Sequence, residues 1–279
     1  MTTQEQPSKA GTLLLGQRTP VVEAYCPQLL YPIPRQEARS TLGIHGVLPF
    51  YGADQWYAYE MSWLDKNARP VARVGRFSVP CSTPNLVESK SFKLYLNSLN
   101  NTQYESEQAA INCIEADVGE IAGAAVLLTL FSPDDDTLRG HVLTGHSLDH
   151  CCASVASGEP VANQIQISAD GPHGEERLFS HLLRSLCPVT GQPDWATVWF
   201  HYRGAQIDHD SLLTYIIAYR QHQEFHEQCV ERMFLDIYRR CKPDFLHIQA
   251  FYTRRGGMDI SPFRSTSPDA LPLPRLNRQ

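Results

Sequence analysis

The first half of the chain has the pattern of apolar and polar positions that is typical of two strands, two helices and a third strand. Residues 56–64, WYAYEMSWL, are rich in aromatic side chains, and after the turn DKNARP residues 71–80 alternate as a returning strand. Helical apolar spacing follows at about 89–99 and 105–118. The apolar run at 121–131 predicts a further strand, which SPDDD stops.

The second half repeats this order. An apolar segment at 176–186 precedes an alternating strand at 196–204, and Asp208 or Asp210 can cap the long helical region that follows, in one helix or two. Residues 244–257 alternate again as a strand that ends in a basic, glycine-rich tip. The two halves therefore predict two related α+β modules.

The remaining segments have less periodicity. Residues 132–174 are rich in Gly, Ser, Asp and His and predict a connector with one or two short strands. We expect a tail and lead-in at 1–40, a first module at 41–135, a connector at 136–174, and a second module at 175–279.

Composition and charge narrow the function classes. The 279 residues are 42% hydrophobic and 19% charged, as in a globular protein with a sizeable core. The net charge of −6 argues against bulk attraction to nucleic acid or to an anionic membrane. The polar start predicts no secretory signal, and none of the eight cysteines forms a C-x-x-C pair, so a cytoplasmic protein with reduced thiols is expected.

Two groups of residues raise the question of a metal. The connector carries several histidines and cysteines, but their spacing fits no standard ligand pattern, and solvated loop residues are the favoured interpretation: His141, His146, His150, Cys151 and Cys152. His222 and His226 are four apart, but the H-E-x-x-H order is absent. The sequence therefore predicts no metal.

The loop SLCPVTGQPDW, residues 185–195, places Cys187 and Asp194 at the two ends of a stretch stiffened by Pro188 and Pro193. In one interpretation the cysteine is a small buried hydrophobe and the aspartate a turn residue. In the other, a thiolate attacks an electrophilic carbon and a nearby acid protonates the heteroatom that gains electrons. The loop alone leaves both open.

Three further stretches add candidate chemistry. Residues 88–98, ESKSFKLYLNS, place an acid, lysines and hydroxyls at a helix start, where free N–H groups favour anions. Residues 224–234, EFHEQCVERMF, offer an aromatic, a histidine and an acid in succession, and residues 252–265, YTRRGGMDISPFRS, offer arginines and glycines suited to a phosphate-bearing ligand. Taken singly, residues 88–98 are more typical of a capped amphipathic helix with solvated lysines, and residues 252–265 are also typical of a strand end with a solvated basic tip.

Taken together, the chain resembles the NADPH-dependent 7-cyano-7-deazaguanine reductases, the nitrile reductases of queuosine biosynthesis, in their long two-module form. The matching segments are ESKSFKLYLNS, QPDW with the preceding Cys187, YRG at 202–204, EFHEQCVER and YTRRGG-x-DI-x-P. The resemblance implies the tunnelling fold with two tandem β-β-α-α-β-β modules, a cytoplasmic homodimer, and a role in tRNA modification without direct binding of nucleic acid.

The resemblance also implies roles for individual residues. Cys187 is expected to form a covalent thioimide with the nitrile, Asp194 to protonate the nitrile nitrogen, and His226 to relay protons to the imine. The implied substrate-binding residues are Val87, Glu88, Ser89, Phe225, His226 and Glu227. The implied cofactor-binding residues are Ser89, Lys90, Arg255 and Gly256, with two NADPH consumed per turnover and no metal.

Some features set limits on this interpretation. Residues 188–191 are less typical of the family, although the spacing from Cys187 to Asp194 is kept, and no G-x-G-x-x-G follows a strand, so a Rossmann-type site is not expected. Two alternatives stay open. One is a zinc-dependent cyclohydrolase of the same fold, which would need a cluster of Cys and His ligands, and the other is a non-catalytic protein that binds a purine or pterin.

Overall fold

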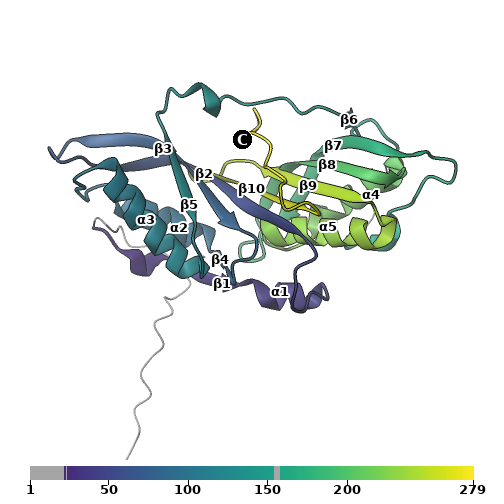
Figure 1. The fold of residues 1–279 in the computed structure, drawn as a ribbon, viewed down its shortest axis with the longest axis horizontal. Coiled ribbons are helices and arrows are strands. Elements are labelled where there is room, and N and C mark those ends of the chain that lie inside the picture. The colour runs from purple at the N-terminus through teal and green to yellow at the C-terminus, as the bar shows by residue number, and fades with distance from the viewer. Residues whose placement is uncertain (1–21, 23, 154–157) are drawn as a thin grey trace, which may run out of the picture.

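The computed structural model describes residues 22, 24–153 and 158–279. The fold is α+β: one sheet of eight strands in the order β5-β3-β2-β10-β9-β8-β7-β6, with a separate two-stranded sheet of β1 and β4 (Figure 1). The strands are β1 (Pro32–Pro34), β2 (Tyr51–Leu64), β3 (Pro70–Pro80), β4 (Asn85–Val87), β5 (Leu127–Phe131), β6 (His146–Ser147), β7 (His173–Leu186), β8 (Pro193–Ala205), β9 (Phe245–Tyr252) and β10 (Met258–Ser265). The α-helices are α1 (Arg35–Thr41), α2 (Ser89–Ser98), α3 (Glu107–Ala122), α4 (His209–Ala218) and α5 (His226–Cys241).

The hairpins and helices follow the sequence pattern closely. β2 and β3 pair antiparallel around a turn in which the side chain of Asp65 accepts from the backbone N–H of Asn67 at 2.8 Å and of Arg69 at 3.0 Å. Such Asx hydrogen bonds fix tight turns. The predicted helices at 89–99 and 105–118 are confirmed as α2 and α3.

The predicted strand at 121–131 is partly wrong. Ile121 and Ala122 complete α3, which ends at Gly123 in the left-handed conformation with φ +82°, and the strand begins only at Leu127. The apolar run is continuous because it covers the buried end of a helix and then a strand, and periodicity alone does not separate the two.

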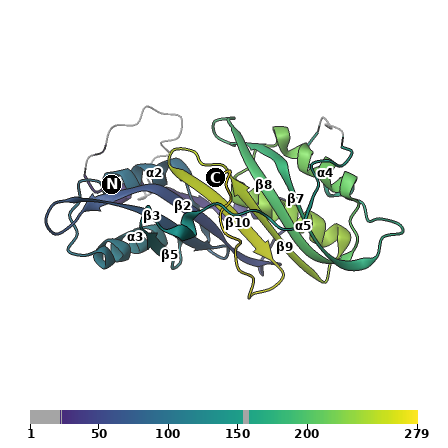
Figure 2. The same cartoon turned by 90° about the horizontal axis from the view of Figure 1, so that it is seen from above.

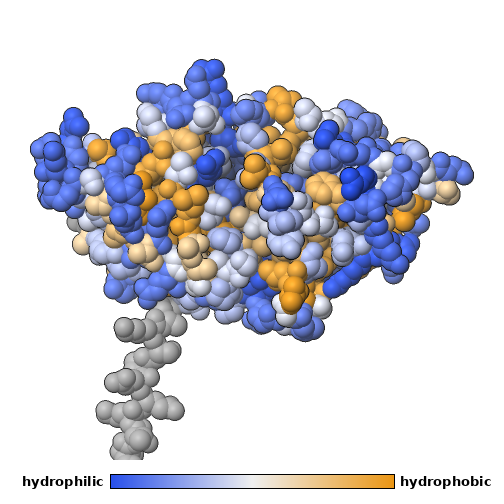
Figure 3. Space-filling view, viewed as in Figure 1, coloured by the Kyte–Doolittle hydropathy of each residue, from blue (hydrophilic) through white to orange (hydrophobic). Residues whose placement is uncertain are grey.

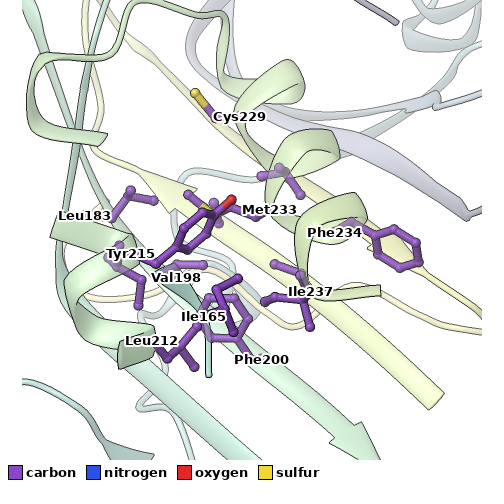
Figure 4. Close-up of a cluster of buried hydrophobic side chains, with 14 of the residues drawn as sticks. Ile165, Leu183, Val198, Phe200, Leu212, Tyr215, Cys229, Met233, Phe234 and Ile237 are labelled. Atoms are coloured by element: carbon purple, nitrogen blue, oxygen red, sulfur yellow. The ribbon is translucent and has the colours of Figure 1, made fainter. Parts of the chain in front are cut away.

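In the second half, Asp208 rather than Asp210 caps the first helix, since its side chain accepts from the backbone N–H of Ser211 at 2.8 Å. Helices α4 and α5 lie on the sheet and enclose a core with it (Figure 4). The side chains that Figure 4 labels in this core are Ile165, Leu183, Val198, Phe200, Leu212, Tyr215, Cys229, Met233, Phe234 and Ile237. Burial of their apolar surface is the main driving force that holds the helices in place.

The strand predicted at 244–257 ends at Tyr252, and a second strand, β10, follows the glycine tip. The sequence did not predict β10, because the segment contains several polar residues and because Pro262 argues against a central strand. Yet β10 is buried along its whole length and pairs with β2 on one side and β9 on the other, so it joins the two halves into one sheet.

At Gly52, where φ is +142°, any Cβ would collide with the carbonyl of Phe263, so only glycine allows the close approach of β2 to β10.

The four longer helices cover one face of the sheet, and the connector crosses over the other face (Figures 1 and 2). The connector contains one short strand, β6, as expected, and this strand pairs with β7 in parallel. In the described residues no second strand pairs beside β5 after α3, so the first half lacks the final strand that the β-β-α-α-β-β order requires.

The surface in Figure 3 is mostly hydrophilic, with apolar atoms gathered over α3 and β5 and near α1. Leu127, at the start of the edge strand β5, is 61% exposed. None of the helices in the described ranges is long and apolar enough to cross a membrane.

Candidate active site

A cavity of about 270 Å³ lies where the two halves of the chain meet. Its walls come from β4 and the start of α2, the β7–β8 loop, the start of α5, and the tip between β9 and β10. All eleven residues predicted for the site line it: Val87, Glu88, Ser89, Lys90, Cys187, Asp194, Phe225, His226, Glu227, Arg255 and Gly256. Four segments far apart in the sequence thus supply one cavity.

Cys187 lies at the end of β7 in a closed loop. Its backbone N–H donates to the carbonyl of Gln192 at 2.9 Å, and its carbonyl accepts from the N–H of Gly191 at 2.9 Å. Gly191 takes the positive φ of +66° that this turn needs. The loop holds a half-buried, free thiol at the cavity wall.

The sequence predicted that Asp194 ends the loop. In the structure Asp194 is instead the second residue of β8. Its carboxylate is 4% exposed, lies 3.2 Å from Nε2 of His226, and forms an ion pair with Arg255. Burial opposes ionisation, but the hydrogen bond and charge of His226 and the charge of Arg255 outweigh it and lower the pKa of Asp194. The carboxylate of the free protein is therefore ionised at neutral pH.

The ring of His226 is fixed on two sides. It stacks on Tyr252 with ring centres 3.7 Å apart and planes 13° from parallel, while Nε2 faces Asp194. Since His226 is the first residue of α5, the helix start positions this imidazole together with Glu227.

Glu88 is the N-cap of α2. Its carboxylate accepts from the backbone N–H of Lys90 at 2.9 Å and of Ser91 at 2.7 Å, and the residue is 1% exposed. Both oxygens of Glu88 are thus engaged by the helix start. Its backbone N–H donates to the carbonyl of Tyr31 at 2.9 Å, which ties the cavity wall to the segment before β1.

Glu227 has a different environment. Burial, assisted by the negative charge of Asp54, raises its pKa to about 7. A buried carboxyl group of this kind is ready to change its charge when a ligand supplies N–H donors.

Lys93 also lines the cavity, although it was not among the residues predicted from the sequence. Burial and the neighbouring charge of Arg255 lower the pKa of its ammonium group. Lys90 and Lys93 are three apart in α2, so their side chains share one helix face, and this spacing is the signal that could have identified Lys93. At Gly256, where φ is +57°, a Cβ would lie 3.3 Å from Cδ of Lys93. The absence of a side chain at Gly256 therefore leaves room for the side chain of Lys93.

The pair His222 and His226 does not form the zinc site that its spacing allows. His222 follows a short 3₁₀ helix and contacts Glu159 and Glu224, while His226 begins α5 and faces Asp194. Among the described residues, no group of three metal-ligating side chains is gathered at this cavity.

Comparison with known proteins decides the family. The model "Nitrile reductase, 7-cyano-7-deazaguanine-reductase N-term" matches residues 21–130, and the model "QueF-like protein" matches residues 193–270. A protein of Chromohalobacter salexigens named NADPH-dependent 7-cyano-7-deazaguanine reductase is 46% identical over 95% of this chain and 96% of its own length. The chain belongs to this family.

Other 7-cyano-7-deazaguanine reductases of the same name agree over similar lengths. The protein of Burkholderia vietnamiensis is 49% identical over 92% of this chain and 94% of its own, and that of Hydrogenovibrio crunogenus is 46% identical over 98% of each. Among solved structures, the apo form of the archaeosine synthase QueF-Like covers 37% of this chain and all of its own at 16% identity, with a TM-score of 0.32. That likeness is too small to carry an argument.

Proposed function

We propose that this protein is an NADPH-dependent nitrile reductase that converts 7-cyano-7-deazaguanine to 7-aminomethyl-7-deazaguanine in queuosine biosynthesis. The observation that carries the proposal is the convergence of Cys187, Asp194, His226 and two buried glutamates on one cavity, in a chain of the reductase family. Neither a zinc-dependent cyclohydrolase nor a purely binding protein has comparable support.

Glu227 is the main substrate anchor in this proposal. The base has a guanine-like edge with adjacent N–H donors, and a carboxylate can accept two of them in parallel. Glu88 already accepts two backbone N–H groups, so it offers the substrate only its remaining lone pairs. Val87 and Ser89 flank it in the wall, and Phe225 offers an aromatic face for the flat base.

Covalent chemistry begins at Cys187. The ionised Asp194 takes the thiol proton, the sulfur adds to the nitrile carbon, and the protonated Asp194 then gives that proton to the nitrile nitrogen. One C–S and one N–H bond form, while the S–H bond and one π bond of the C≡N group break. The product is a thioimide, whose carbon accepts hydride more readily than a nitrile carbon.

Two hydrides and two further protons complete the reduction. The first hydride and a proton would convert the thioimide to a tetrahedral adduct, and this adduct would expel the Cys187 sulfur, pass a proton from nitrogen back to it, and leave an imine. The second hydride goes to the imine carbon and a proton from the side of His226 goes to nitrogen. When bound, NADPH supplies one hydride in each step, so two molecules are consumed.

The cofactor would lie along the basic wall. Ser89, Lys90, Arg255 and Gly256 are the proposed contacts, and Lys93 adds a further cation suited to phosphate. Arg255 contacts Asp194 and Gln192 in the free protein. A phosphate that attracts Arg255 away from Asp194 would raise the pKa of that carboxyl group, which favours the protonated form needed for proton donation.

We also propose the finer features of the fold and assembly. The repeated hairpin and helix-pair order supports a two-module tunnelling fold, with the module boundaries near residues 41–135 and 175–279. The open edge of β5 with exposed Leu127 supports a homodimer. The net charge of −6 supports an enzyme without direct contact to nucleic acid, and the eight free cysteines support a reducing, cytoplasmic location.

The covalent step is tested by intact mass spectrometry. The protein is mixed with 7-cyano-7-deazaguanine without NADPH, beside Cys187→Ala and, as a control, Cys26→Ala, which removes another half-buried thiol that does not line the cavity. We expect a mass gain of one substrate in the wild type and in Cys26→Ala, none in Cys187→Ala, and discharge by NADPH. Absence of an adduct in protein that still binds the base would contradict the mechanism.

A further inference from the structure

A second cluster of reactive side chains lies away from the cavity. His146, Cys151 and His209 each place a ligand atom within 4.8 Å of the other two. His146 belongs to β6, Cys151 to the turn after it, and His209 begins α4, at the same end of the molecule (Figure 1). In the part of the chain that the structure describes, this is the one such group of three.

The backbone around His146 and Cys151 is fixed. β6 pairs with β7, the buried Leu148 donates its N–H to the carbonyl of Phe179 at 2.8 Å, and Cys151 donates its N–H to the carbonyl of Leu148 at 2.9 Å. Asp149, between them, accepts from the hydroxyl of Ser180 at 2.7 Å. The two ligand side chains from the connector are therefore held at one place on the sheet edge.

His209 is oriented by its own neighbours. Its Nε2 lies 3.3 Å from a carboxylate oxygen of Glu176, and the other oxygen of Glu176 accepts from the hydroxyl of Tyr202. The rings of His146 and His209 stack with centres 5.1 Å apart. A carboxylate that holds one nitrogen of an imidazole is a common device for orienting the other nitrogen towards a metal.

We propose that His146, Cys151 and His209 bind one divalent cation of the zinc class, with water in the fourth position. Two imidazoles and one thiolate are ligands that zinc prefers, and three protein ligands leave one position of a tetrahedron open. The sequence favoured solvated loop residues here because the connector alone has no standard spacing. The fold supplies the missing ligand, His209, from a distant helix.

The cation would act on structure rather than on the reaction. None of the three ligands lines the active-site cavity. Helix α4 starts at His209 and its ten residues extend about 15 Å, and Glu224 of the cavity wall follows six residues after the helix ends. The metal would fasten the connector to the second half of the molecule, and the inference does not depend on the proposed reaction.

The test uses the full chain after removal of metal by a chelator. Zinc binding is measured by equilibrium dialysis with elemental analysis, and cobalt is used as a spectroscopic probe. We expect one metal per chain, a sulfur-to-cobalt charge-transfer band that Cys151→Ser abolishes, and at least tenfold weaker binding in Cys151→Ser and in His209→Ala. The matched controls Cys152→Ser and His150→Ala change the adjacent thiol and imidazole and should bind within about twofold of the wild type.

Three outcomes would overturn the site. Wild-type binding no tighter than that of Cys151→Ser or His209→Ala would show that these residues are not ligands. Loss of the cobalt band in Cys187→Ala instead of Cys151→Ser would place the metal at the cavity. Turnover that chelation abolishes and zinc restores would assign the metal to the reaction, whereas we expect Cys151→Ser and His209→Ala to keep their turnover without added metal.

Discussion

At the scale of single residues, burial and nearby charge give the carboxyl groups of the cavity opposite tendencies. Asp194 is held ionised by His226 and Arg255, whereas Glu227, buried near the negative Asp54, has its pKa raised to about 7. One cavity therefore holds an ionised carboxylate, which the proposed mechanism uses as the proton acceptor for the Cys187 thiol, and a carboxyl group whose charge depends on pH.

The raised pKa of Glu227 predicts pH-dependent substrate binding. Only the ionised carboxylate accepts two N–H groups, and its population rises from about a tenth at pH 6 to about nine tenths at pH 8 for a pKa of about 7. We expect the affinity for 7-cyano-7-deazaguanine to increase about tenfold over this range, measured by calorimetry in the Cys187→Ala background so that binding stays reversible.

The control is Glu227→Gln in the same background. It should bind more weakly at pH 8 and show no comparable pH dependence, because an amide does not titrate. A wild-type affinity that is constant from pH 6 to pH 8 would contradict the assignment of Glu227 as the pH-dependent anchor.

At the scale of elements, helix starts supply most of the proposed site residues. Glu88 both caps α2 and lines the cavity, and His226 and Glu227 open α5. The free N–H groups of a helix start are partners for carboxylates and phosphates. The same local geometry that begins a helix thus places its first residues in the cavity wall.

The cap of α2 predicts a loss of both stability and substrate binding. Glu88→Ala removes the acceptor of two backbone N–H groups and should lower the free energy of unfolding by about 0.5–2 kcal/mol. Urea denaturation measures this loss, and steady-state kinetics should show a raised KM.

Ser106→Ala is the matched control, since Ser106 caps α3 by accepting from the N–H of Ala109 at 3.1 Å and does not line the cavity. It should cost a similar free energy of unfolding and leave KM unchanged. A Glu88→Ala protein as stable as the wild type would refute the role of Glu88 as a cap.

At the scale of the whole molecule, a buried group of charges joins the elements around the centre of the sheet. Glu231 of α5 contacts Arg39 at 2.7 Å and Arg264 at 2.8 Å, and Asp54 of β2 contacts Arg264 at 2.8 Å and Arg35 at 2.5 Å. All five side chains are almost fully buried. Removal of one charge leaves its partners unpaired away from water.

Glu231→Ala should therefore lower the free energy of unfolding by about 3–5 kcal/mol, measured by urea denaturation at pH 7.5. The control Glu107→Ala removes the half-exposed carboxylate that pairs with Arg73 at the surface and should cost at most about 1 kcal/mol. Equal losses in the two variants would contradict a structural role for the buried group.

The same group sets the acid limit of stability. Burial opposes ionisation of Glu231, but Arg264, Arg39 and Arg35 lower its pKa below the ordinary value of 4.5. A depressed carboxyl pKa contributes stability that is present above pH 4.5 and is lost as pH falls towards the folded-state pKa. The wild type should lose stability below about pH 4.5, and Glu231→Ala should show a smaller loss over that range.

The sequence by itself determined the elements whose signals are local. Alternating apolar positions predicted one strand of each hairpin, and an aromatic-rich or apolar run predicted the other. Helical spacing predicted α2 and α3, because side chains that share a face recur at fixed intervals along the chain. Turn and cap chemistry at Asp65 and Asp208 acts within a few residues, so it too is visible in sequence. Long, unusual segments such as ESKSFKLYLNS and EFHEQCVER indicated the family.

Tertiary structure decided what depends on contacts between distant segments. β10 became a central strand despite Pro262 because β2 and β9 supply partners on both sides. Lys93 lies at the cavity because of how α2 packs in the fold. His209 lies beside His146 and Cys151 because the fold places the start of α4 next to the connector. Burial and charge at a point are sums over all surrounding segments, so the ionised Asp194 and the raised pKa of Glu227 follow from the fold rather than from the local sequence.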